Sequence, residues 1–72
     1  MSRSITDLKE IVRLGGGLSL DAGSRPTADL KELARQTKVS GAKLIIRNAG
    51  VKTINDLKDI ARQAPGQVIF EI

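Results

Sequence analysis

A seven-residue pattern that occurs three times constrains this 72-residue chain more than any other feature. Residues 7–13, 29–35 and 56–62 share the order Asp, Leu, Lys, acidic, aliphatic, smaller aliphatic, Arg. A pattern that returns after 22 and then 27 residues indicates one supersecondary unit used three times. The repeat therefore determines the expected fold, although it does not by itself indicate a function.

The spacing inside the pattern is helical. Leu8, Ile11 and Val12 stand at i, i+3 and i+4, which lines one face of a helix, and the other two copies keep this spacing. A glycine that can end the helix follows each copy: these are Gly15, Gly41 and Gly66. The pattern thus predicts three amphipathic helices.

Cap residues mark the predicted helix starts. Ser4 and Thr53 each stand three residues before the Asp of a repeat, which fits an N-terminal capping box with an acidic third residue. The second helix begins differently, after Pro26, and Thr27 is its predicted N-cap.

A short apolar run follows each glycine. Residues 18–22 and 67–72 have an apolar side chain at every second position, which is typical of half-buried strands, and Leu44 and Ile46 match this period in residues 43–47. One face of each predicted strand should contact the helices: Leu18, Leu20, Ala22, Leu44, Ile46, Val68, Phe70 and Ile72. Ile45 and Ile69 then belong to the opposite face.

The predicted fold is a single α/β domain over residues 1–72, with the order α-β-α-β-α-β and repeats at about 4–23, 26–50 and 53–72. Strands joined through a helix pair in parallel with right-handed crossovers. Three similar units most simply give strand order 1-2-3 with every helix on one face. A doubly wound order 2-1-3 is the alternative, and three helices of one pattern argue against it.

This layout resembles, in architecture alone, a short solenoid of the leucine-rich-repeat kind. The repeat lengths suit that comparison. However, the residues 44–49, Leu-Ile-Ile-Arg-Asn-Ala, lack the family's Leu-x-Leu-x-x-Asn spacing, and the other repeats have no matching Asn. The resemblance therefore implies no functional residue.

Composition excludes several classes of protein. A chain of this size buries a modest core, and without cysteine or histidine it has no disulfide and no ordinary zinc site, so a partner chain is a natural source of stability. No apolar run approaches the roughly 20 residues of a membrane helix. The N-terminal region lacks an apolar signal core. We expect a cytoplasmic protein that has no cofactor and no membrane contact.

Two surfaces of the predicted fold are suited to self-association. The open sheet face carries Ile45 and Ile69 side by side, with Arg47 at its rim, although β-branched residues are also chosen for strand propensity alone. The C-terminal strand, with Val68, Phe70 and Ile72, has no proline or lysine to protect its edge. Water satisfies such an edge as well, but pairing with a second copy is the functional interpretation.

Basic residues suggest an alternative interpretation. Lys and Arg four apart in each repeat form a stripe, and the net charge is +4. The stripe fits phosphate contacts or, more simply, a solvated salt-bridged face. Two strand-to-helix loops carry Arg25, Thr27, Lys52 and Thr53, which suit a weak anion site, or ordinary turns and caps. One aromatic residue, Phe70, cannot form a base-stacking platform.

Catalytic chemistry has little support, because the chain has no His, Cys or Tyr to act as a general base or nucleophile. The favoured hypothesis is a non-enzymatic protein interaction module that forms a homodimer. A weak nucleic-acid or anion binder is the alternative. A third interpretation is an idealised repeat protein without a binding function, since caps, stops and periodicity agree closely.

Overall fold

The computed structural model describes residues 4–72, and the elements in this part of the chain follow the predicted order. They are α1 (Ile5–Arg13), β1 (Leu18–Asp21), η1 (Ala22–Ser24), α2 (Thr27–Ser40), β2 (Leu44–Arg47), η2 (Ala49–Val51), α3 (Ile54–Gln63) and β3 (Val68–Phe70). Two short 3₁₀ helices, η1 and η2, are additional to the prediction. They connect the first two strands to the helices that follow.

Side-chain caps begin α1 and α3 as the sequence predicts. The Ser4 hydroxyl accepts a hydrogen bond from the Asp7 amide at 3.2 Å, and the Thr53 hydroxyl accepts one from the Asp56 amide at 3.2 Å. Each bond satisfies one of the amide groups that a helix leaves unpaired at its first turn.

The predicted cap of α2 is wrong. Pro26 occupies the N-cap position, and Thr27 is already the first helical residue, with no side-chain cap bond. The proline carbonyl accepts hydrogen bonds from the amides of Asp29 and Leu30. The Thr27 hydroxyl is engaged elsewhere, since it donates to Asp56 on α3 at 3.3 Å. A proline with φ of −66° starts the helix without a side-chain cap.

Glycine ends α2 as expected but does not end α3. Gly41 adopts φ of 81°, and its amide donates to the Thr37 carbonyl at 2.8 Å. Glycine enters this left-handed conformation without the steric cost of a Cβ atom. In contrast, α3 already ends at Gln63 with Ala64 as its C-cap, so Gly66 belongs to the following turn.

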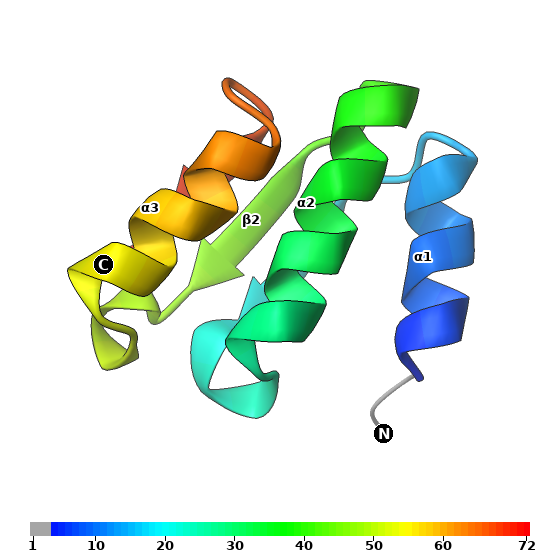
Figure 1. Ribbon diagram of the computed structural model, residues 1–72. Helices are drawn as coiled ribbons and strands as arrows, with labels where there is room; N and C mark the ends of the chain where they lie inside the picture. Colours follow the sequence, from blue (N-terminus) through cyan, green and yellow to red (C-terminus); the bar gives the residue numbers. More distant parts are fainter. Residues whose placement is uncertain (1–3) are drawn as a thin grey trace.

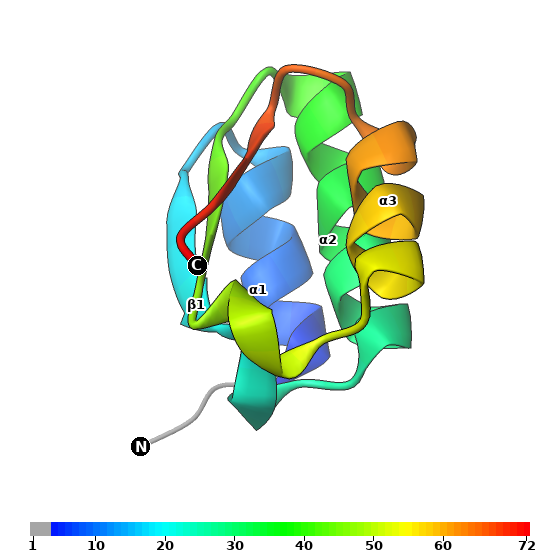
Figure 2. The same cartoon turned by 90° about the vertical axis from the view of Figure 1, so that its left-hand side faces the viewer.

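The strands form a parallel sheet in the order β1-β2-β3, which confirms the predicted order and excludes the order 2-1-3. Figure 1 shows the three helices side by side in the sequence α1, α2, α3, with the sheet behind them. The view along the sheet in Figure 2 shows that all three helices cover the same face.

The core lies between this helical layer and the sheet. Leu44 and Ile46 on the central strand are fully buried, whereas the corresponding side chains of the two edge strands are partly buried. Ile72 differs from its prediction. It is 95% exposed instead of facing the helices, because β3 ends at Phe70 and the last two residues continue beyond it.

Candidate functional site

The open face of the sheet is the first candidate surface, since no helix of residues 4–72 covers it (Figure 2). The register places Ser19 beside Ile45 and Ile45 beside Ile69, which makes one row across three strands. Ile69 is 47% exposed, and Ile45 is half-buried between its neighbours. The structure therefore places the two isoleucines of the predicted surface in direct succession on this face.

Charged residues surround this apolar pair. Arg47 is exposed at the end of β2 and stands beside Asp21 of β1 in the register. At the opposite end, Lys43 donates from Nζ to the Gly66 carbonyl oxygen at 3.1 Å. Because the rim of this small apolar area carries charges of both signs, it suits a partner surface that also carries both signs. A second copy of the chain has such a surface.

The outer edge of β3 is the second candidate surface. Leu44 donates its amide to the Gln67 carbonyl, and Glu71 donates its amide to the Ile46 carbonyl, both at 2.9 Å. Alternate strand residues direct their backbone groups to opposite edges, so the groups of Val68 and Phe70 point away from β2. No further strand follows β3 within residues 4–72. At this edge Val68 and Phe70 therefore present backbone N–H and C=O groups for pairing with another strand, while their side chains pack against the core.

The structure brings the two predicted anion-binding loops together. Lys52 donates from Nζ to the carbonyl oxygen of Arg25 at 3.1 Å, which links the loop after β2 to the loop after β1. The threonine hydroxyls have other roles. Thr53 caps α3, and Thr27 donates to the carboxylate of Asp56. The Asp56 carboxylate beside Thr27 opposes the binding of an anion at these loops.

The basic stripe on the helices is largely neutralised by neighbouring acids. Each repeat Arg pairs with the acid three residues before it: Arg13 with Glu10, Arg35 with Glu32, and Arg62 with Asp59. Lys9 also lies 3.5 Å from Glu32 on the next helix. The hydrogen bond from Arg35 is the largest cause that lowers the pKa of Glu32 below its ordinary value. The arrangement matches the simpler prediction of a salt-bridged face.

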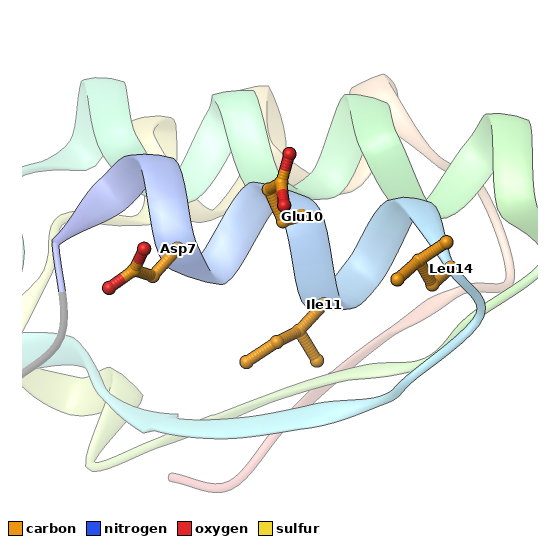
Figure 3. Close-up of a pocket in the computed structure, with 4 residues that line it drawn as sticks. All are labelled: Asp7, Glu10, Ile11 and Leu14. Carbon is orange, nitrogen blue, oxygen red and sulfur yellow. The ribbon is translucent and has the colours of Figure 1, made fainter.

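A groove along α1 is a surface that the sequence analysis did not single out. Figure 3 shows four side chains on the flank of α1 that is turned away from α2: Asp7, Glu10, Ile11 and Leu14. Ile11 is 41% exposed and Leu14 is 84% exposed. The sequence could have indicated this surface. The helix of the first repeat has no preceding repeat helix within the described residues, so the side that would contact such a helix stays open.

Other kinds of site find no support in the described part of the chain. Residues 4–72 contain no group of three or more acidic or other metal-ligating side chains that could hold a metal ion. None of their helices is both long and apolar enough to cross a membrane. Comparison with protein-family models, with curated proteins and with solved structures finds no match. The function must therefore be inferred from the surfaces themselves.

Proposed function

We propose that this chain is a small non-enzymatic protein–protein interaction module that binds a second copy of itself through the open sheet face. The adjacent pair Ile45 and Ile69 carries this proposal, because it places β-branched apolar side chains on a face that no helix covers in the described part of the chain. Arg47, the outer edge of β3 at Val68 and Phe70, and the exposed Ile72 beyond that strand supply further contacts around it.

The size of the chain favours self-association. A 72-residue domain buries a smaller share of its surface than a larger domain does, and it has no disulfide to compensate. Two identical faces that meet across a two-fold axis would cover both isoleucine pairs at once, with each charged rim residue facing a different residue of the partner.

Sedimentation equilibrium across a range of protein concentrations tests the proposal. Ile45→Asp and Ile69→Asp each place a charge in the apolar pair, and we expect a lower weight-average mass than the wild type shows at the same concentration. Val39→Asp is the matched control, since Val39 is 83% exposed at the end of α2. A monomeric wild type at every concentration would contradict the proposal, and so would equal effects of all three variants.

A weak anion or nucleic-acid binder is the alternative function, and the Lys52–Arg25 contact is the observation that favours it. It is less well supported, because acids neutralise the helix stripe and Asp56 stands beside the loops. The alternative predicts retardation of a duplex or single-stranded oligonucleotide at low salt, with binding that falls steeply as salt rises. Unchanged mobility of both oligonucleotides at low salt would exclude it.

A further inference from the structure

The three copies of the repeat have different exposure at one apolar position. Ile11, Leu33 and Ile60 are equivalent, yet Leu33 and Ile60 are fully buried while Ile11 is 41% exposed. Both α2 and α3 have another helix on the side of the preceding repeat, whereas α1 stands at the end of the row (Figure 1). The position therefore faces the preceding helix, and in α1 that contact is missing.

At the next position of the repeat, the exposed copy is the last one and not the first. Val12 and Ala34 are fully buried, and the equivalent Ala61 on α3 is only half-buried. This position is covered by the helix that follows, and α3 has no following helix among the described residues. Each helix thus has two distinct flanks, and the outermost flanks of α1 and α3 lack their neighbours.

Polar contacts between the helices assign further positions to the same flanks. Glu32 on α2 lies 3.5 Å from Lys9 on the preceding helix. Gln63 on α3 accepts a hydrogen bond from Arg35 on the preceding helix at 3.2 Å. The acidic position of the repeat and the position after its Arg therefore face backward. In α1 these positions are held by Glu10 and Leu14.

The Asp that opens each repeat also faces backward, because Asp56 accepts a hydrogen bond from Thr27 on the preceding helix. The four backward-facing positions in α1 are the four residues that line the groove in Figure 3: Asp7, Glu10, Ile11 and Leu14. The groove is thus the surface on which a preceding helix of this repeat would pack. Its shape and chemistry are those of an internal contact that lacks one partner.

Both terminal flanks expose large apolar side chains, which is unusual for ends that face water. Leu14 replaces the Gln found at the equivalent positions, and it is 84% exposed. On the outer flank of α3, Ile54 is 66% exposed, whereas the equivalent Ile5 of α1 is partly buried against the core. Repeat arrays normally end in polar capping surfaces. Both ends of this row of helices expose apolar side chains instead, as expected for ends that are covered by another molecule.

The two ends are complementary to each other. The outer flank of α3 carries Ile54, Lys58 and the half-buried Ala61, all at positions that face a following helix. Lys58 is equivalent to Lys9, and Glu10 is equivalent to Glu32, so an α3 flank against an α1 flank repeats the Lys9–Glu32 pair. The small Ala61 side chain leaves space for Ile11, the larger residue at the neighbouring position.

The sheet edges are compatible with the same arrangement. Leu18 donates its amide to the Lys43 carbonyl, so the amide of Ser19 points to the outer edge of β1. The backbone groups of Val68 and Phe70 point to the outer edge of β3. A parallel pairing of these two edges continues the sheet from one copy to the next, alongside the helix contact.

We infer that the α1 flank groove of one copy receives the α3 flank of a second copy, so that copies stack end to end in repeat order. The inference rests on the proposed self-association, but it uses residues separate from Ile45 and Ile69. Because the contact joins two different surfaces, each added copy leaves one groove and one α3 flank open, and assembly continues unless a ring closes.

Charge reversal tests this arrangement. Glu10→Lys opposes Lys58 with a lysine, and Lys58→Glu opposes Glu10 with a glutamate, so each variant should weaken end-to-end association by roughly tenfold or more. In an equimolar mixture of the two variants, each contact between unlike copies again joins a lysine to a glutamate. The double variant restores the same attraction within one kind of chain, because positions 10 and 58 again carry opposite charges. Lys38→Glu, at the exposed end of α2, is the control for the lower net charge of Lys58→Glu. The double variant keeps the wild-type net charge and so separates the contact from the charge change of Glu10→Lys.

Sedimentation equilibrium of these proteins separates the inference from the proposed function. Weakening by each single variant with recovery in the mixture and in the double variant supports the end-to-end contact. A wild type that associates, with both single variants matching Lys38→Glu, overturns the end-to-end contact and leaves self-association through the sheet face intact. A wild type that stays monomeric at every concentration overturns both, and points to another occupant of the groove.

Discussion

The exposure of one repeat position predicts two different costs for the same substitution. Ile→Ala removes three carbon groups, which at about 0.8 kcal/mol each corresponds to roughly 2.4 kcal/mol for a fully buried side chain. Ile60 is fully buried, so Ile60→Ala also leaves a cavity, and we expect a loss of about 3–4 kcal/mol. Ile11 is 41% exposed and open to solvent, so Ile11→Ala should lower the free energy of unfolding by only about 1.5 kcal/mol.

Urea denaturation at low micromolar protein measures both values in the single molecule. A domain of this length has a total stability of roughly 4–11 kcal/mol, so Ile60→Ala removes a large share of it. If that variant does not fold, Ile60→Val should still lose about 1 kcal/mol. The slope of free energy against urea should not change, since neither substitution alters the extent of unfolding.

Equal losses for Ile11→Ala and Ile60→Ala in dilute protein would refute the reasoning, because they would mean that the α1 flank is already covered within one copy. Repeating the measurement at high protein concentration adds a second comparison. If a second copy docks on the flank, association stabilises the wild type, and the cost of Ile11→Ala should rise with concentration. The cost of Ile60→Ala should stay nearly constant, because Ile60 is internal in every state.

Three further predictions concern single residues. Thr37 is fully buried, and its hydroxyl donates to the Ala34 carbonyl at 2.6 Å within the same helix. Thr37→Val should therefore leave the melting temperature unchanged or raise it. A decrease of more than about 1 kcal/mol in the free energy of unfolding would contradict this. Asn48 has φ of 57°, so Asn48→Ala should cost about 1 kcal/mol in thermal denaturation while Asn48→Gly should not, and equal stabilities would refute the backbone argument. The lowered pKa of Glu32 stabilises the fold above the unfolded-state pKa of about 4.3, and this contribution is lost as the pH falls through the lower folded-state pKa. Glu32→Gln should therefore flatten the acid limb of the stability curve, and an unchanged limb would show that the Arg35 pair does not contribute.

The periodicity of the sequence was sufficient to predict the layers and the strand order. Each helix repeats the i, i+3, i+4 spacing, and each strand is a short apolar run after a glycine, so the two kinds of element could be separated and counted. The longer second interval corresponds to an extended helix end, since α2 has 14 residues against 9 in α1 and 10 in α3. These features depend on local pattern, which a single sequence displays directly.

Predictions that depended on competing partners were less successful. Thr27 has the chemistry of a cap, but its hydroxyl contacts Asp56, and a proline supplies the helix start instead. Ile72 continues the alternation of its strand, yet it lies beyond the last paired residues and is exposed. In both cases the local pattern was satisfied, and contacts distant in the sequence determined the outcome.

The α1 flank shows how a repeat distinguishes the two sides of a helix. An apolar stripe predicts which side of a helix faces the sheet, but not which residues face the neighbouring helices. Comparison of side-chain size supplies that distinction: the position of Ile11, Leu33 and Ile60 is always large, while the next position is Val or Ala. A large residue on one helix beside a small one on its neighbour sets the order of packing along the row. At one end of the row, the large Ile11 has no small residue of a preceding helix beside it. At the other end, the small Ala61 has no large residue of a following helix beside it. The end-to-end contact follows from the same complementarity that orders the three helices within one copy.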